Sequence, residues 1–284
     1  MGIRKADFAG SWYPSRPDDC EREILAFLED NNISSPSGKH LVGGIVPHAG
    51  WYFSGSIACN VIRALKDEPA PDVVVIFGMH LHENSPRYIM KEGSWETPFG
   101  DIKIADELTA KLIEQFSFNI ETAENHQPDN TIELQLPFVK YLLENVKIVP
   151  IGVPPATHSL RIGEAVAEIA NELGMKLKVI GSTDLTHYGY NYGFVTEGTG
   201  PEAVDWVRNT NDRRVIDAML DMNPDNVINE ARASQNACCA GAASTAIACA
   251  NFLGATRADS IAYATSYDKS PGDSFVGYVG IVFG

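Results

Sequence analysis

Four short apolar runs, rich in valine and isoleucine, are spread over the first two thirds of the chain. They are "LVGGIVP" (41–47), "DVVVIFG" (72–78), "VKIVPIGV" (146–153) and "LKVIGST" (177–183). A run of this length without polar alternation predicts a strand that is covered on both faces of a sheet.

Helical periodicity fills the segments between these runs. These segments are 54–66, 106–116, 131–144 and 159–173. Ser54 stands where a capping residue would start the first of them. Buried strands that alternate with amphipathic helices indicate a largely parallel sheet with helices on both faces.

The last third of the chain has a different pattern. Segments 202–222 and 224–234 have helical periodicity, while 239–253 is small and apolar on all sides, which predicts a buried helix. Two strand-like runs, "DSIAYATSY" (259–267) and "SFVGYVGIVFG" (274–284), follow and are joined by the turn residues "DKSPGD". We therefore predict an α/β fold in which helices flank a central mixed, largely parallel sheet that ends in an antiparallel pair.

Composition narrows the domain count and the range of partners. The 284 residues are 44% hydrophobic and contain no linker-like tract and no repeat of fixed period, so we expect one domain over 1–284. The formal net charge is −15 and the basic residues are scattered. Nucleic acid and anionic membrane surfaces, which need a basic face, are therefore not expected as partners.

The sequence predicts a cytoplasmic protein with reduced thiols. Its five cysteines contain no CxxC pair, and no signal peptide or myristoylation pattern opens the chain. No apolar segment reaches the length of a membrane span.

Histidines follow three of the predicted strands. His48 follows the first run, His80 and His82 follow the second, and His187 follows the fourth, with Asp184 three residues earlier. A single histidine in such a place is more often a loop residue bound to backbone. Because the carboxyl ends of neighbouring parallel strands meet at one edge of a sheet, however, three such junctions favour a shared site.

Imidazoles combined with an anionic ligand suit Fe(II), Zn(II) or copper. The anionic candidates are Cys238 or Cys239 and Glu133. A buried cysteine is often only a small apolar residue, so the cysteine pair does not by itself predict a metal site. The GxSxG motif of serine hydrolases and the glycine-rich motifs GxGxxG and GxxxxGK[ST] of nucleotide sites are missing from the sequence.

Several motifs, in their order along the chain, resemble those of the Memo family, which shares its fold with the class III extradiol ring-cleaving dioxygenases. They are "AGSWYP" (9–14), "VPHAGWYFSG" (46–55), "TIELQLPF" (131–138), "STDLTHYG" (182–189), "NACCAG" (236–241) and "DSFVGYVGIVF" (273–283). Each motif is short, but together they cover nearly the whole chain.

The resemblance implies a dioxygenase-like fold and an iron-type site. The dioxygenases use two histidines and a glutamate, and Memo proteins have cysteine in the place of the glutamate. Carried over to this sequence, the ligands are His48, one of His80 and His82, and Cys238. His187 is then an acid/base or substrate-binding residue, with Asp184 nearby.

Three departures from the family pattern bear on the site. The family's second histidine aligns with Leu81, so the resemblance does not choose between the histidines on either side of it. Asn130 replaces a pocket histidine. The residue after the cysteine is Cys239 in place of glycine, and Ala242 stands in place of a proline, which changes how the thiolate is presented.

We therefore expect a non-haem metal oxidoreductase, dioxygenase-like, that acts on a small molecule. Fe(II) is the expected cofactor, with copper or zinc as alternatives, and His187, Asp184 and Glu133 are the catalytic candidates. Trp51, Tyr52 and Tyr188 either wall the pocket or belong to the core.

Two other functions stay open. One is a ligand- or peptide-binding module with a vestigial metal pocket, and the other is a zinc hydrolase with Glu133 or Asp184 as general base. The resemblance to bacterial relatives also implies a radical-SAM partner, and it leaves room for a homo-oligomer.

Overall fold

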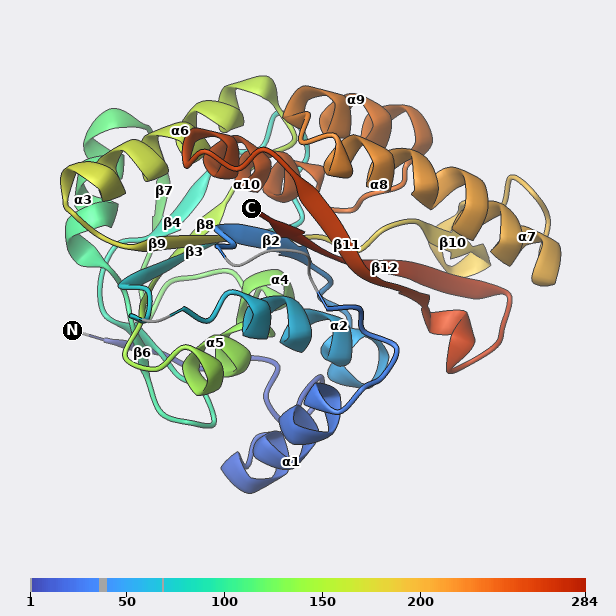
Figure 1. Cartoon of the computed structure of the whole chain (residues 1–284), viewed down its shortest axis with the longest axis horizontal. Helices are drawn as coiled ribbons and strands as arrows, with labels where there is room; N and C mark the ends of the chain where they lie inside the picture. Colours follow the sequence, from blue (N-terminus) through green and yellow to red (C-terminus); the bar gives the residue numbers. More distant parts are fainter. Residues whose placement is uncertain (1, 36–39, 68) are drawn as a thin grey trace.

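The main sheet lies at the centre of the fold. In this computed structural model, which describes residues 2–35, 40–67 and 69–284, the main sheet has nine strands. They are β2 (Gly43–Val46), β3 (Val73–Gly78), β4 (Tyr88–Met90), β7 (Asn119–Glu121), β8 (Lys147–Gly152), β9 (Leu177–Ser182), β10 (His187–Gly189), β11 (Ala258–Thr265) and β12 (Ser274–Phe283). Their order is β10-β12-β2-β9-β3-β8-β4-β7, with β11 paired to β12 (Figure 1).

The centre of this sheet is parallel, and an antiparallel pairing lies on each side of that centre. Strands β2, β9, β3 and β8 are parallel neighbours, and they are formed by the four apolar runs of the sequence. Strand β12 is antiparallel to β2, β11 and β10, and β4 is antiparallel to β8. The predicted α/β fold with a mixed, largely parallel sheet is confirmed.

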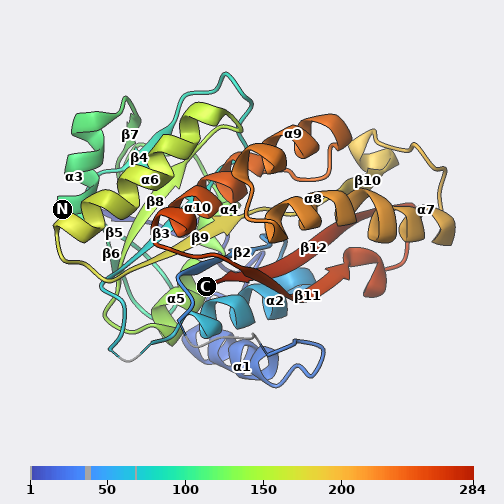
Figure 2. The ribbon, with the colours of Figure 1, turned by 45° about the horizontal axis from the view of Figure 1, so that its top comes forward.

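Helices cover both faces of the sheet. They are α1 (Pro17–Leu28), α2 (Trp51–Ala64), α3 (Asp106–Gln115), α4 (Asn130–Glu133), α5 (Leu136–Leu142), α6 (Thr157–Glu172), α7 (Pro201–Trp206), α8 (Asp212–Leu220), α9 (Pro224–Ser234) and α10 (Ala240–Phe252). Helices α3, α6, α8, α9 and α10 cover one face, and α1, α2, α4 and α5 cover the other (Figures 1 and 2). Strand β3 shows why both faces are apolar. Val75 and Phe77 enter one core, whereas Val74 and Ile76 enter the other.

Helix α10 is the buried helix that the small residues of 239–253 predict. It packs so closely on α6 that a Cβ on Gly163 would collide with the carbonyl group of Thr245. Among the described helices, α10 included, none is both long and apolar enough to cross a bilayer.

Two predicted helices are divided in the structure. The segment 131–144 forms α4 and α5, because Pro137 at the start of α5 has no N–H to continue the preceding turn. The segment 202–222 forms α7 and α8, with a π-helix, η2 (Val207–Asn211), between them. Ser54 is not a cap, since α2 begins after Gly50 and the Ser54 hydroxyl donates to the carbonyl oxygen of Ala49.

Short strands account for most of what the pattern missed. Strands β4, β7 and β10 have three residues each. A separate small sheet is formed by β1 (Ile3–Arg4), β5 (Ser94–Trp95) and β6 (Ile102–Lys103). Elements of two or three residues are too short to show a period in the sequence.

Candidate metal centre

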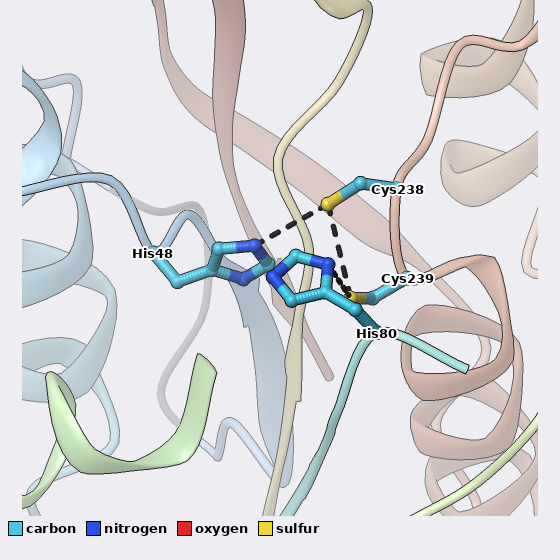
Figure 3. Close-up of side chains that lie close together, drawn as sticks. All are labelled: His48, His80, Cys238 and Cys239. Atoms are coloured by element: carbon cyan, nitrogen blue, oxygen red, sulfur yellow. Dashed lines mark hydrogen bonds between the residues drawn. The ribbon is translucent and has the colours of Figure 1, made fainter. Parts of the chain in front are cut away.

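Three neighbouring strands, β2, β9 and β3, end at the same edge of the sheet, and the site lies just beyond that edge. His48 follows β2 and His80 follows β3, while Cys238 and Cys239 lie just before α10. We call these four residues the donor cluster. Each offers one ligand atom, and the four atoms lie within 4.8 Å of one another. Figure 3 shows the two imidazoles and the two sulfur atoms facing a common centre.

The contacts inside the donor cluster are close. The Cys238 Sγ atom lies 3.3 Å from His48 Nε2 and 3.8 Å from Cys239 Sγ. The Cys239 Sγ atom lies 3.4 Å from His80 Nδ1, and the two imidazole rings are nearly perpendicular. His48 and Cys239 are buried, whereas His80 is exposed, so the cluster is open on one side.

A serine holds the His48 ring in the orientation that a ligand needs. His48 Nδ1 lies 3.1 Å from Ser182 Oγ, and the Ser182 hydroxyl donates its own proton to the carbonyl oxygen of Thr131 at 2.6 Å. Ser182 can therefore only accept from His48, so Nδ1 carries the proton. Nε2 is left for the cluster, as in metal-bound histidines whose second nitrogen is hydrogen-bonded.

The orientation of His80 depends on a turn in the backbone. Met79, directly before His80, has a φ of 71°, which is uncommon for a residue other than glycine. The Met79 N–H donates to the Thr131 hydroxyl at 2.7 Å. Thr131 thus supports both histidines, His80 through this bond and His48 through Ser182. Neither Thr131 nor Ser182 was expected at the site, although both lie inside the quoted motifs.

Backbone hydrogen bonds fix the two cysteines to the end of β9. The N–H of Cys238 donates to the carbonyl oxygen of Asp184, and the N–H of Asp184 donates to Cys238 Sγ at 3.3 Å. The N–H of Cys239 donates to the Thr183 hydroxyl at 3.0 Å. A sulfur that accepts a backbone N–H is better stabilised as a thiolate.

The electrostatics of the cluster favour an imidazolium–thiolate pair in the metal-free protein. Burial disfavours the charged imidazole, but the negative charges of Asp184 and Cys238 outweigh it and raise the pKa of His48 to about 9. Burial likewise opposes the thiolate of Cys238, yet the hydrogen bond from Cys239 and the charge of His48 bring its pKa well below the usual range. At these two residues, ion binding would therefore displace only the proton on His48 Nε2.

Asp184 holds His48 from the backbone side. Its carboxylate accepts the His48 N–H at 2.7 Å and lies 3.9 Å from His48 Nε2. The side chain is buried, and burial raises the pKa of this carboxyl group. Asp184 is thus in contact with the candidate ligand His48, and it also lines the adjoining cleft.

A cleft of about 560 Å³ opens beside the donor cluster, between the start of α2 and the β10–β12 region. It is lined by His48, His80 and His187, among others. Its aromatic lining residues are Trp12, Tyr52, Phe53, Tyr192 and Tyr278. A second cleft, of about 450 Å³, lies against Cys238 and shares His80, His187 and Tyr192 with the first.

His187 begins β10 and reaches this cleft. Its Nδ1 atom lies 3.1 Å from the carbonyl oxygen of Leu185, which only accepts, so Nδ1 carries the proton and Nε2 is free to accept another. Tyr192 packs edge-on against the ring. Asn130 also lines the cleft, and its amide group donates to the carbonyl oxygen of His48.

Other sequence candidates lie outside the donor cluster. His82 is exposed, and its backbone bonds to Ser85. The carboxylate of Glu133 is buried and accepts hydrogen bonds from the backbone of Asp7 and Phe8 and from the hydroxyl of Tyr13, so it anchors the N-terminal segment. Neither residue lines the two clefts.

The aromatic candidates divide between the cleft and the core. Tyr52 lines the cleft and is 64% exposed, whereas Trp51 stacks on Phe138 in the core. Tyr188 is fully buried, and its hydroxyl donates to the carbonyl oxygen of Gly198.

Comparisons with known proteins agree with the motifs. The family model "Memo-like protein" matches residues 4–282. A MEMO1 family protein of Pyrococcus furiosus, PF1638, is 34% identical over 290 residues, covering 99% of this chain and 98% of that relative. A MEMO1 family protein of Thermococcus onnurineus is 35% identical over 291 residues, covering 99% of each chain.

Among solved structures, the fold is similar to that of an uncharacterized protein, JW3007, of Escherichia coli K12. The TM-score is 0.49 at 9% identity, and the match covers 86% of this chain and 100% of that one. The family model and the relatives span nearly the whole sequence, and on those two findings this chain belongs to the Memo family.

Proposed function

We propose that this Memo-family protein is a metal-dependent oxidoreductase that acts on a small molecule bound in the larger cleft. One observation carries the proposal. Nitrogen and sulfur donors converge within 4.8 Å at the wall of a cleft of about 560 Å³, and a further histidine faces the same space. A core cluster without function would not leave its donor atoms aimed at one point beside a cleft.

The residues present fit a metal ion. His48, His80 and Cys238 would hold it, since Ser182 leaves Nε2 of His48 available and Cys238 is stabilised as a thiolate. The family resemblance implies Fe(II), whereas sulfur beside imidazole favours copper among the redox-active ions. Copper or iron bound there would supply one-electron redox chemistry and would polarise a substrate oxygen.

His187 would move a proton during the reaction. Its Nε2 atom is free because Nδ1 is fixed on Leu185, and the ring lines the same cleft as His48 and His80. A substrate hydroxyl placed between these residues would give its proton to His187 Nε2. General base catalysis of this kind contributes about 10²- to 10⁴-fold to a rate.

The walls of the cleft favour a flat, weakly charged substrate. Aromatic side chains such as Trp12, Tyr52 and Tyr278 provide apolar faces, and the hydroxyls of Ser266 and Ser270 provide polar contacts. Phenols and related reductants are therefore the first compounds to screen.

Oxygen uptake by the metal-loaded protein tests the proposal. The protein is purified anaerobically, loaded with copper or iron, and mixed with a panel of phenols and other organic reductants. We expect oxygen uptake with at least one compound, and a kcat about 10²- to 10⁴-fold lower in His187→Gln at unchanged metal content. His158→Gln, which changes an exposed histidine of α6, is the control. Uptake at the rate of the free ion across the panel would contradict the proposal.

A further inference from the structure

Cys239 belongs to the donor cluster although the proposed ligands do not include it. We infer that Cys239 is a fourth metal ligand, so that this chain holds a tetrahedral ion between two imidazole nitrogens and two sulfurs. The inference rests on the proposed function only because both concern the same metal site. It assigns Cys239 a role beyond that of a small buried residue.

Three of the six distances between donor atoms match the edges of a tetrahedron around one ion, and all six lie within 4.8 Å. Metal bonds of about 2.3 Å to sulfur and about 2.05 Å to nitrogen give tetrahedral edges of about 3.8 Å between two sulfurs and about 3.6 Å between sulfur and nitrogen. The observed sulfur–sulfur distance between Cys238 and Cys239 is 3.8 Å. The sulfur–nitrogen distances are 3.3 Å from Cys238 to His48 and 3.4 Å from Cys239 to His80.

The backbone explains how two adjacent cysteines come to face the same point. Side chains of consecutive residues in an extended chain point to opposite sides. Here the N–H groups of Cys238 and Cys239 are bound to Asp184 and Thr183 respectively, at the end of β9. The carbonyl oxygen of Cys239 accepts from the first turn of α10. Cys239 is therefore fixed at both of its peptide groups, with its sulfur against His80.

Burial alone does not produce this arrangement. Cys249 lies in the same helix α10 and is fully buried, and burial raises its pKa without any contribution from a neighbouring donor. Among the described residues, the group of His, Cys, Asp and Glu side chains close enough to hold an ion consists of the donor cluster alone.

Two sulfurs and two nitrogens in a tetrahedron select particular ions. Zn(II) and Co(II) accept this donor set readily, and so does reduced copper, whereas a non-haem Fe(II) site normally offers two histidines and a carboxylate. Four protein donors complete the tetrahedral shell, so a substrate would reach the ion as a fifth ligand. His80, the exposed member, marks the side from which it would come.

Titration with Co(II) tests the inference without any need for turnover. Each thiolate bound to Co(II) adds near-ultraviolet charge-transfer absorption, and competition with Zn(II) gives the affinity. The wild-type protein, Cys239→Ala and the matched control Cys249→Ala are titrated under anaerobic, reducing conditions. Cys239→Ser serves as a second variant of similar volume, and thermal unfolding with EDTA shows that each variant is folded.

We expect about one bound Co(II) per chain in the wild type and in Cys249→Ala, with two-thiolate absorption. In Cys239→Ala and Cys239→Ser the absorption per bound Co(II) should fall to about half. The affinity should fall by more than about 100-fold, since loss of a residue that merely supports a ligand already costs 10- to 100-fold. Equal absorption and affinity in the wild type and the folded Cys239 variants would overturn the inference.

The outcomes separate this inference from the proposed function. Two-thiolate absorption in a protein that oxidises none of the compounds would support the fourth ligand and contradict the oxidoreductase. One-thiolate absorption in a protein that does consume oxygen would do the reverse. A wild-type protein that binds no Co(II) would overturn the inference and the metal site together.

Discussion

The partly buried donor cluster and the fully buried Glu133 carboxylate are both groups of polar atoms inside the fold, yet their contacts differ in kind. The oxygens of Glu133 are occupied by the N–H groups of Asp7 and Phe8 and by the Tyr13 hydroxyl. In the donor cluster, the nitrogens of His48 and His80 and the two sulfurs face one another beside a cleft.

The difference shows that burial and charge do not by themselves identify a functional group. A buried carboxylate with its acceptors occupied contributes to folding, because those bonds compensate for the loss of water. Donor atoms that converge on one another at the wall of a cleft are suited to a ligand. Four predictions test this distinction, beginning with the largest expected effect.

The largest effect is expected from the choice between His80 and His82. His80→Ala should weaken metal binding by more than about 100-fold because it removes a ligand, whereas His82→Ala should leave the affinity unchanged. Metal competition titrations on both variants measure this. A larger loss of metal affinity in His82→Ala than in His80→Ala would mean that His82 is the ligand.

Glu133→Gln should lower the stability of the fold and leave metal binding unchanged. The amide keeps the shape but replaces an acceptor oxygen with a donor that faces other donors, so the free energy of unfolding should fall by about 3 kcal/mol. Urea unfolding measures the change, and metal stoichiometry is the control. A loss of metal at unchanged stability would place Glu133 in the metal site. It would then contradict the distinction between a carboxylate that supports folding and donor atoms that bind a ligand.

Asp212 is a second buried carboxyl group and provides a test by pH. Its oxygens accept from Thr186 and Tyr263, but burial is the stronger influence and raises its pKa to about 6. The folded chain then holds this proton more tightly than the unfolded chain. Stability from this group is therefore greatest below about pH 4 and is lost as the pH rises through about 6, by about 3 kcal/mol.

Asp212→Asn should remove this part of the pH dependence. Urea unfolding at several pH values between about 4 and 7 should show the wild type losing more stability with rising pH than the variant. Parallel curves would show that Asp212 has no raised pKa in the folded protein.

The smallest effect on metal affinity is expected when the hydrogen bond that orients the His48 ring is removed. Ser182→Ala removes the acceptor for Nδ1 and should weaken metal binding by 10- to 100-fold, or about 1.4–2.7 kcal/mol. Ser159→Ala is the matched control, since Ser159 is also buried and donates to a carbonyl oxygen outside the site. Equal affinities in the two variants would show that Ser182 does not orient the ring.

Much of the fold was predictable because the four apolar runs are long enough to reveal buried strands. The position of His48 followed from the same pattern, since a histidine directly after a buried strand lies at the strand's carboxyl end. The choice between His80 and His82 was not predictable, because it depends on the left-handed backbone of Met79.

Contacts between residues far apart in the chain could not be predicted from the sequence either. The sequence shows that Glu133 is acidic but not that its partners lie 120 to 126 residues away. Likewise, adjacent cysteines in a sequence do not reveal that both sulfurs face the same point, which here depends on hydrogen bonds to Thr183 and Asp184.

Metal content after anaerobic purification tests the central claim most directly. The wild-type protein and His48→Ala are purified side by side, and bound copper, iron and zinc are measured together with the fraction of folded protein. We predict about one equivalent of copper or iron per wild-type chain and almost none in folded His48→Ala. Zinc alone would favour hydrolytic or purely structural use of the site. No metal in the wild type, even after reconstitution, would contradict the metal centre itself.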